Sequence, residues 1–249
     1  MRVRSLSLVL PLTAIAFLAA GCTSTGSSQS ESPLSPAQKE KALSEVERLT
    51  QLVERTDDPI QRSRHLMLIG SYYSLMHDPS SSLEAYEEAR RLREAAGAYA
   101  LARESAVMAA SAMSAGGEPE KAIELLEEDL ERHGEPASPE QSAEIHHQLA
   151  RMYIAADRFD AAARSARIAA GKYRELYRRE QEAEMLYLQA MALNRLDQTE
   201  RAGDLVRRSY EFYNDRAEAY NDIEYELKAE RMLNTAAEWG VDTSQWKPR

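Results

Sequence analysis

The sequence predicts an all-α protein built as a solenoid of antiparallel helix pairs with a period of about 40 residues. Small residues, mostly alanine, recur 40 positions apart, and prolines recur on the same spacing. Apolar residues make up 43% of the 249 residues, and no strand-like alternation separates the prolines. Because a single helical pair cannot bury its own apolar face, such pairs must stack on one another.

Composition excludes several protein classes. The chain has 10 Gly, 9 Pro and 1 Cys, which excludes collagen-like, low-complexity and disulfide-scaffold proteins. Its formal charge is -10, from 31 basic and 41 acidic side chains. Binding to phosphate backbones requires a basic face, so no nucleic-acid partner is expected.

Residues 1–21 are predicted to be a signal peptide. Arg2 and Arg4 precede an almost wholly apolar run from Leu6 to Ala20. The run has roughly 15 residues, too few for a helix that spans about 30 Å of hydrocarbon. It ends in Leu18-Ala19-Ala20-Gly21-Cys22, which resembles the lipobox of bacterial lipoproteins, and Cys22 is the only cysteine. The alternative is an ordinary signal peptide cleaved near Ala20.

The lipobox resemblance implies lipidation of Cys22 with a diacylglyceryl thioether and an N-acyl chain such as palmitate. Two or more acyl chains suffice for stable membrane anchoring. Ala19 stands where the commonest pattern has Leu. Thr23, in place of Asp, points to the outer membrane in a diderm bacterium. We therefore expect a lipid-anchored protein of the cell envelope, facing the periplasm if the source is diderm.

Residues 22–35 are expected to form a flexible tether, because Ser and Thr dominate and apolar side chains are rare. Residues 36–240 are expected to form the repeat domain, and residues 241–249 a C-terminal tail. The helix that contains Ala42 is expected to cap the N-terminal end of the solenoid. A single final helix over residues 214–239 is expected to cap the other end.

Within the repeat domain, each period is predicted to hold two amphipathic helices, such as residues 64–76 followed by 82–93. Small residues mark the close approach of each pair, and on the second helix these are Ala42, Ser82, Ala122, Ala162 and Ala202. On the first helix the small residues are Gly70, Ala110, Ala150 and Ala190. Prolines that break helix interiors mark the helix boundaries, at Pro59 and Pro139 and at Pro79 and Pro119. The alternative is a helical bundle whose alanines repeat by chance.

These columns resemble the tetratricopeptide repeat (TPR), whose usual period is shorter, over about residues 36–214. The clearest match is the series Leu149, Ala150, Tyr153, Phe159, Ala162 and Ala169. Asp129 and Ser209 depart from the pattern, because each replaces its last alanine. The resemblance implies a right-handed α-solenoid whose first helices build a concave groove for a partner protein.

No catalytic residue, metal ligand or cofactor is predicted. The sequence contains no phosphate loop, CxxC, HExxH or GxSxG motif. His146 and His147 are adjacent, so on a helix they point about 100° apart and cannot share one ion. Runs of acidic residues are interpreted as solvated helix faces.

The TPR resemblance also implies which side chains face the groove. They are Met67, Ser71, Val107, Ser111, His147, Arg151, Tyr187, Met191 and Arg195. This face is apolar with a little positive charge, and it lacks the Lys and Asn set with which one TPR class clamps a chaperone's carboxylate. It suits an apolar helix or extended peptide with an occasional acidic group.

Two functional hypotheses follow. The first is a membrane-anchored adaptor that binds a protein or peptide segment in its groove and so assists assembly of an envelope complex. The second is an accessory regulator of a peptidoglycan enzyme, or a peptide-sensing protein.

Overall fold

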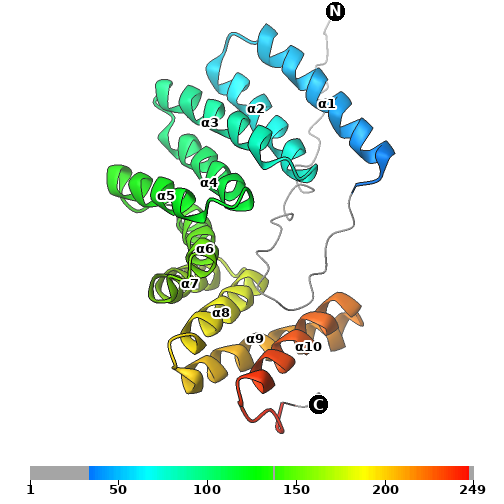
Figure 1. Cartoon of the computed structure of the whole chain (residues 1–249), viewed down its shortest axis with the longest axis vertical. Coiled ribbons are helices and arrows are strands. Elements are labelled where there is room, and N and C mark those ends of the chain that lie inside the picture. Colours follow the sequence, from blue (N-terminus) through cyan, green and yellow to red (C-terminus); the bar gives the residue numbers. More distant parts are fainter. Residues whose placement is uncertain (1–33, 137, 247–249) are drawn as a thin grey trace, which may run out of the picture.

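The computed structural model describes residues 34–136 and 138–246. This part of the chain contains ten α-helices and no strand, so the predicted all-α solenoid is confirmed (Figure 1). The expected signal peptide, Cys22 and residues 22–33 of the expected tether lie outside the described residues.

The helices follow one another with short turns. Their bounds are α1 Pro36–Arg55, α2 Pro59–Leu75, α3 Pro79–Ala95, α4 Tyr99–Ala115, α5 Pro119–His133, α6 Pro139–Ala155, α7 Phe159–Glu175, α8 Arg179–Asn194, α9 Thr199–Tyr220 and α10 Ile223–Glu238. From α2 to α9 every helix begins 20 residues after the one before it, so two helices make up the period of 40.

The helix starts follow from local sequence. Pro59, Pro79, Pro119 and Pro139 each occupy the first turn of a helix, where a missing N–H costs nothing. The side chains of Asp58, Asp78 and Ser138 accept hydrogen bonds from backbone N–H groups of the turn that follows. The proline spacing therefore marks helix beginnings, as the sequence predicts.

The turns between helices also repeat. His77, Asp157, Tyr177 and Asp197 all adopt the left-handed conformation, with φ between 55 and 59°. In the first of these turns the His77 N–H donates to the Ser74 carbonyl, and the Asp78 N–H donates to that of Tyr73. This pair of backbone hydrogen bonds closes the C-terminus of a helix around one left-handed residue. Each turn thus reverses the chain within three residues.

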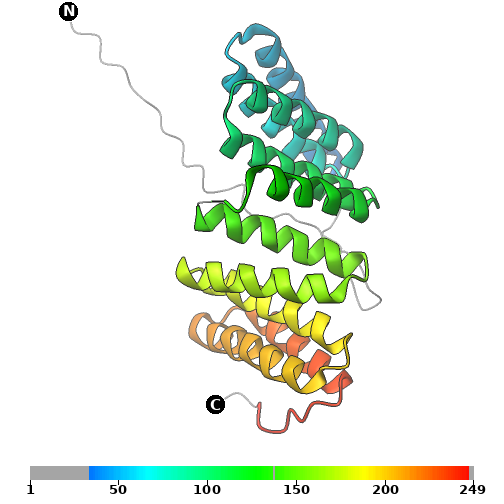
Figure 2. The same ribbon diagram turned by 90° about the vertical axis from the view of Figure 1, so that its left-hand side faces the viewer.

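The helices stack in sequence into a curved rod. Each helix packs on the next, and α4 also contacts α6 while α6 contacts α8. Figure 1 shows the stack curving so that α1 and α10 both lie on its right-hand side, at the two ends of the curve. In the view of Figure 2 the helices lie as successive layers along the long axis.

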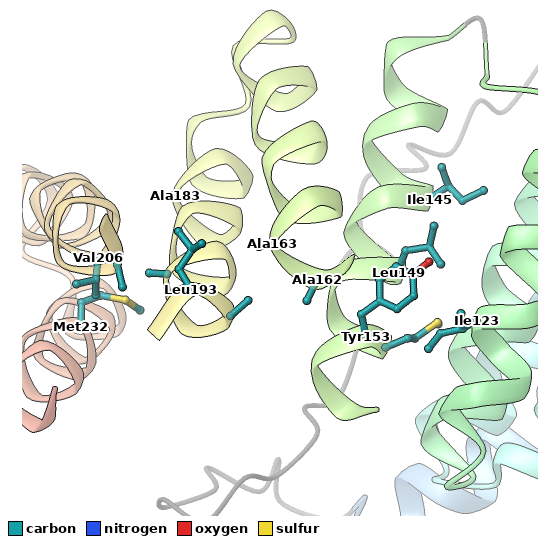
Figure 3. Packing of buried hydrophobic residues seen from close by; sticks show 14 of the residues in the cluster. Ile123, Ile145, Leu149, Tyr153, Ala162, Ala163, Ala183, Leu193, Val206 and Met232 are labelled. Atoms are coloured by element: carbon teal, nitrogen blue, oxygen red, sulfur yellow. The ribbon is translucent and has the colours of Figure 1, made fainter. Parts of the chain in front are cut away.

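The core runs along the rod. Figure 3 shows part of its largest cluster, which includes Ile123 on α5, Leu149 on α6, Leu193 on α8, Val206 on α9 and Met232 on α10. The predicted small columns lie between the paired helices and are fully buried at Ala110, Ala122, Ala150, Ala162, Ala190 and Ala202. Small side chains let the backbones approach, and the larger ones fill the remaining space.

The C-terminal end differs from the sequence prediction. The prediction of a single helix over residues 214–239 is wrong, because α9 continues to Tyr220 and α10 begins at Ile223. Asn221 between them is left-handed with φ 50°, and the Asp222 side chain accepts a hydrogen bond from the Glu224 N–H, which caps α10. Residues 241–246, which we expected to belong to a tail, pack on α9 through Val241 and the buried Trp246.

Candidate functional site

The inner face is the surface formed by α2, α4, α6 and α8 around Met67, Val107, His147 and Tyr187. Side chains on alternate helices meet there: Ser105 of α4 lies 3.5 Å from the Met67 sulfur of α2, and Ser111 of α4 donates to Gln148 of α6 at 3.1 Å. Eight of the nine predicted groove residues lie on these helices, and Arg195 is the C-cap of α8.

The nine residues differ in accessibility. Partly buried side chains, which can reach a partner, are Met67, Ser71, Ser111, Arg151, Tyr187 and Met191. Val107 is 5% exposed and belongs to the core, and His147 is 8% exposed. Arg195 is exposed, with its guanidinium 4.6 Å from the Phe159 ring centre and 3.6 Å from Asp157. Its contacts are therefore with the α6–α7 turn and the start of α7.

A chain of polar contacts crosses the inner face. Ser111 donates to Gln148, and the Gln148 amide donates to Glu144 Oε1 at 2.9 Å. Glu144 Oε2 accepts from the Tyr173 hydroxyl at 3.4 Å, and that hydroxyl lies 3.0 Å from His147 Nδ1. We call these five residues together with Glu184 the inner network. It connects α4, α6, α7 and α8.

His147 lies at the centre of the inner network. Because the Tyr173 hydroxyl donates to Glu144, its oxygen accepts a hydrogen bond from the His147 Nδ1–H group. His147 Nε2 then faces Glu184 Oε1 at 3.5 Å, and within the described residues this buried nitrogen has no hydrogen-bond partner. A buried polar atom without a partner is costly unless water or a ligand satisfies it.

The carboxylate of Glu184 is stabilised by nearby positive groups. Burial raises its pKa, but the His147 imidazole and the charges of Arg151 and Lys228 outweigh burial and hold the pKa below its usual value. Burial, together with the neighbouring carboxylates of Glu144 and Glu184, raises the pKa of Tyr173 far above its usual value. Tyr173 therefore remains a neutral donor, while Glu184 remains charged.

Tyr187 also connects the inner face to the C-terminal helix. Its hydroxyl lies 3.1 Å from the Thr235 hydroxyl of α10, and Glu180 accepts from Lys228 at 2.8 Å. The side chain of Met191 lies one turn further along α8 and is half-buried. These contacts fix the far end of the inner face.

Sequence reasoning missed Glu144, Gln148, Tyr173 and Glu184. Two signals were present, since Glu104, Glu144 and Glu184 lie 40 apart, as do Tyr173 and Tyr213. The inner face thus carries carboxylates as well as the apolar and positive groups we expected.

The described part of the chain contains neither a metal-binding cluster nor a membrane-spanning helix. Residues 34–136 and 138–246 contain no group of three His, Cys, Asp or Glu side chains that could hold a metal ion. Among the ten helices none is long and apolar enough to cross a membrane.

Comparison with known proteins identifies the fold. No protein-family model and no curated protein matches this chain. Among solved structures, the apo form of RapI has a TM-score of 0.59 at 14% identity, covering 81% of this chain and 78% of that protein. A putative kinesin light chain from Podospora anserina with nearly identical TPR-like repeats has a TM-score of 0.56 at 19% identity, covering 74% and 92%. BtubC (BKLC) from P. vanneervenii has a TM-score of 0.59 at 16% identity, covering 86% and 93%. These likenesses show a TPR-like fold.

Proposed function

We propose that this chain is a scaffold that binds a peptide segment of another protein on its inner face, between α4 and α8. The inner network carries the proposal, because it holds polar groups from four helices in fixed positions. Partly exposed Ser111, Arg151 and Met191 lie on the same helices. Groups fixed before binding lose little entropy when a partner arrives.

The chemistry of this surface suits a short segment with mixed side chains. Met191 and Tyr187 offer adaptable and aromatic contact area. Arg151 and the carboxylates of Glu144 and Glu184 offer charged partners on the same surface. The function that these groups support is recognition, with no catalytic step of its own.

We further propose that acyl chains on Cys22 anchor this scaffold to the membrane of the cell envelope, the outer membrane if the source is diderm. Confinement to a membrane raises the effective concentration of partners in the same membrane. Replacing Cys22 by Ala is expected to move the protein from the membrane fraction to the soluble fraction. Intact mass measurement of the mature protein should show the acyl mass in the wild type alone.

The binding proposal is tested by affinity capture with the full chain from detergent-solubilised envelope. Met191→Glu and Ser111→Glu place charge on partly buried positions of the inner face. Arg167→Glu places it at an exposed position on α7 and serves as the control. All three variants are first checked for unchanged melting temperature.

We expect both inner-face variants to lose the same captured protein, at least tenfold by quantitative mass spectrometry, while the control retains it. Retention of every captured protein by both inner-face variants would rule out the inner face as the binding surface.

A further inference from the structure

Three arginines surround one buried carboxylate at the α7–α8 turn. Glu182 has a side chain only 8% exposed, and it accepts from Arg174 at 2.6 Å and from Arg179 at 2.9 Å. A nitrogen of Arg208, on α9, lies 3.9 Å from the same Glu182 oxygen that Arg174 contacts. We call these four residues the arginine cluster.

The arginine cluster carries a surplus of positive charge. Three guanidinium groups and one carboxylate leave a net charge of +2. In the described part of the chain, Glu182 is the only carboxylate within 4.0 Å of the three arginines. The nearby Glu175 and Glu180 form ion pairs with Lys172 and Lys228 instead. The three side chains remain 51%, 53% and 47% exposed, so a second anion can reach them.

The hydrogen-bonding capacity of the cluster is also unfilled. Three guanidinium groups offer about fifteen N–H donors, whereas one carboxylate offers roughly four acceptor sites. The first turn of α8, which contains Arg179 and Glu182, has no side-chain cap, so its first backbone N–H groups lack a side-chain acceptor as well. Guanidinium groups match carboxylates in two-point geometry, which favours an anion of that shape.

Tyr177 lies in the turn between Arg174 and Arg179 and is 83% exposed. Its left-handed backbone, with φ 59°, holds the ring out at the tip of the turn. Tyrosine and arginine are the residues that most often carry binding energy at protein interfaces. An exposed tyrosine beside surplus arginines therefore favours a polypeptide over a free anion.

The arginine cluster and the inner face point in different directions. Glu182 and Glu184 are two residues apart on α8, which places them about 160° apart around the helix axis. A partner could therefore contact both surfaces only by wrapping around α8, and two separate segments could bind at once.

We propose that the arginine cluster binds an acidic segment of a partner protein, in which neighbouring Asp or Glu side chains contact Arg174 and Arg208 and an apolar side chain packs on Tyr177. The proposal goes beyond binding on the inner face. The exposed ring of Tyr177 gives such a segment an apolar contact that a lipid headgroup does not offer, which favours a polypeptide as the occupant.

The test uses fluorescence anisotropy with the purified full chain and a labelled peptide of alternating Glu and Leu. The same peptide with Gln for Glu is the ligand control. The variant is R174Q with R208Q, which leaves the pair of Glu182 with Arg179 intact. The matched control is R48Q with R91Q, because each of these exposed arginines forms a single pair with a nearby Glu.

We expect the wild type to bind the Glu peptide and to bind the Gln peptide at least tenfold more weakly. The R174Q/R208Q variant should lose at least tenfold in affinity for the Glu peptide, whereas R48Q/R91Q should bind it as the wild type does. The melting temperature of R174Q/R208Q should stay within a few degrees of the wild type, which separates loss of the binding surface from loss of the fold. Equal binding of the Glu and Gln peptides, or an unchanged affinity of R174Q/R208Q, would overturn the proposal. Binding of inorganic phosphate or of phosphatidylglycerol vesicles without binding of the Glu peptide would overturn it as well.

Discussion

Gly70 of α2 and Tyr86 of α3 are in such close contact that a Cβ atom on Gly70 would lie 2.5 Å from Cε1 of the tyrosine ring. The ring is fully buried. The equivalent positions of later repeats pair an alanine with a smaller side chain, as in Ala150 with Ala166 and Ala190 with Val206. The first pair thus exchanges a methyl group on one helix for an aromatic ring on the other.

Replacing Gly70 by Ala is expected to destabilise the domain by about 1–3 kcal/mol, because the ring cannot move without disturbing a packed core. Gly171 of α7 is the control, since a Cβ there meets nothing within 4 Å. Gly171→Ala should instead stabilise the helix by roughly 0.5–1 kcal/mol. Urea unfolding of both variants measures the difference, and equal effects would show that the contact with Tyr86 is unimportant.

Asp129 is expected to stabilise the fold through Arg103, which it contacts at 2.6 Å with both side chains largely buried. Asp129→Ala leaves the guanidinium without its carboxylate and should cost about 3–5 kcal/mol. The double variant Asp129→Leu with Arg103→Met should recover most of that loss. Glu118→Ala breaks an exposed pair with Lys121 and should cost no more than about 1 kcal/mol in the same unfolding measurement.

The C-terminal segment should contribute to stability. Trp246 is 8% exposed, and its ring lies 5.7 Å from that of Tyr210. Trp246→Ala is expected to lower the free energy of unfolding by about 3 kcal/mol. Ile223→Ala, at a side chain 67% exposed, should change it by less than about 0.5 kcal/mol. If the two variants melt alike, residues 241–246 do not belong to the cooperative unit.

The lowered pKa of Glu184 predicts how the stability of the domain changes with pH. Its pKa is lowered from 4.5 in the folded protein, so its contribution is fully present above that value and is lost as the pH falls through the lower folded pKa. Thermal melts of Glu184→Gln should therefore lose less stability than the wild type as the pH falls from about 5 toward the folded pKa. Identical pH profiles would mean that His147 and Arg151 do not stabilise this carboxylate.

The fold could be predicted from the sequence because its signals are local and periodic. Pro59, Pro79, Pro119 and Pro139 fix helix beginnings, and the buried alanine columns fix the spacing. The departures from the TPR pattern could be explained only from contacts that the structure shows. Asp129 occupies an alanine position because Arg103 lies opposite, and the Ser209 hydroxyl donates to the Ala183 carbonyl at 2.8 Å.

The candidate site could be predicted only in part. The register gives the first-helix positions such as Ser111 and Met191, but Tyr173 lies on a second helix and reaches the inner face between α6 and α8. The arginine cluster joins α7, α8 and α9, and no single period of the sequence brings its members together. Left-handed Tyr177 is likewise outside the usual preferences of its residue type.

The most direct test of the account is site-specific photo-cross-linking in cells that produce the full chain. A benzophenone amino acid replaces Met191 or Ser111 on the inner face, or the exposed Arg167 on the outer side of α7. We expect the same partner protein to be cross-linked from both inner positions. It should not be cross-linked from the outer position or by the chain that lacks the benzophenone amino acid. Cross-links to that partner from Arg167 alone would contradict recognition on the inner face.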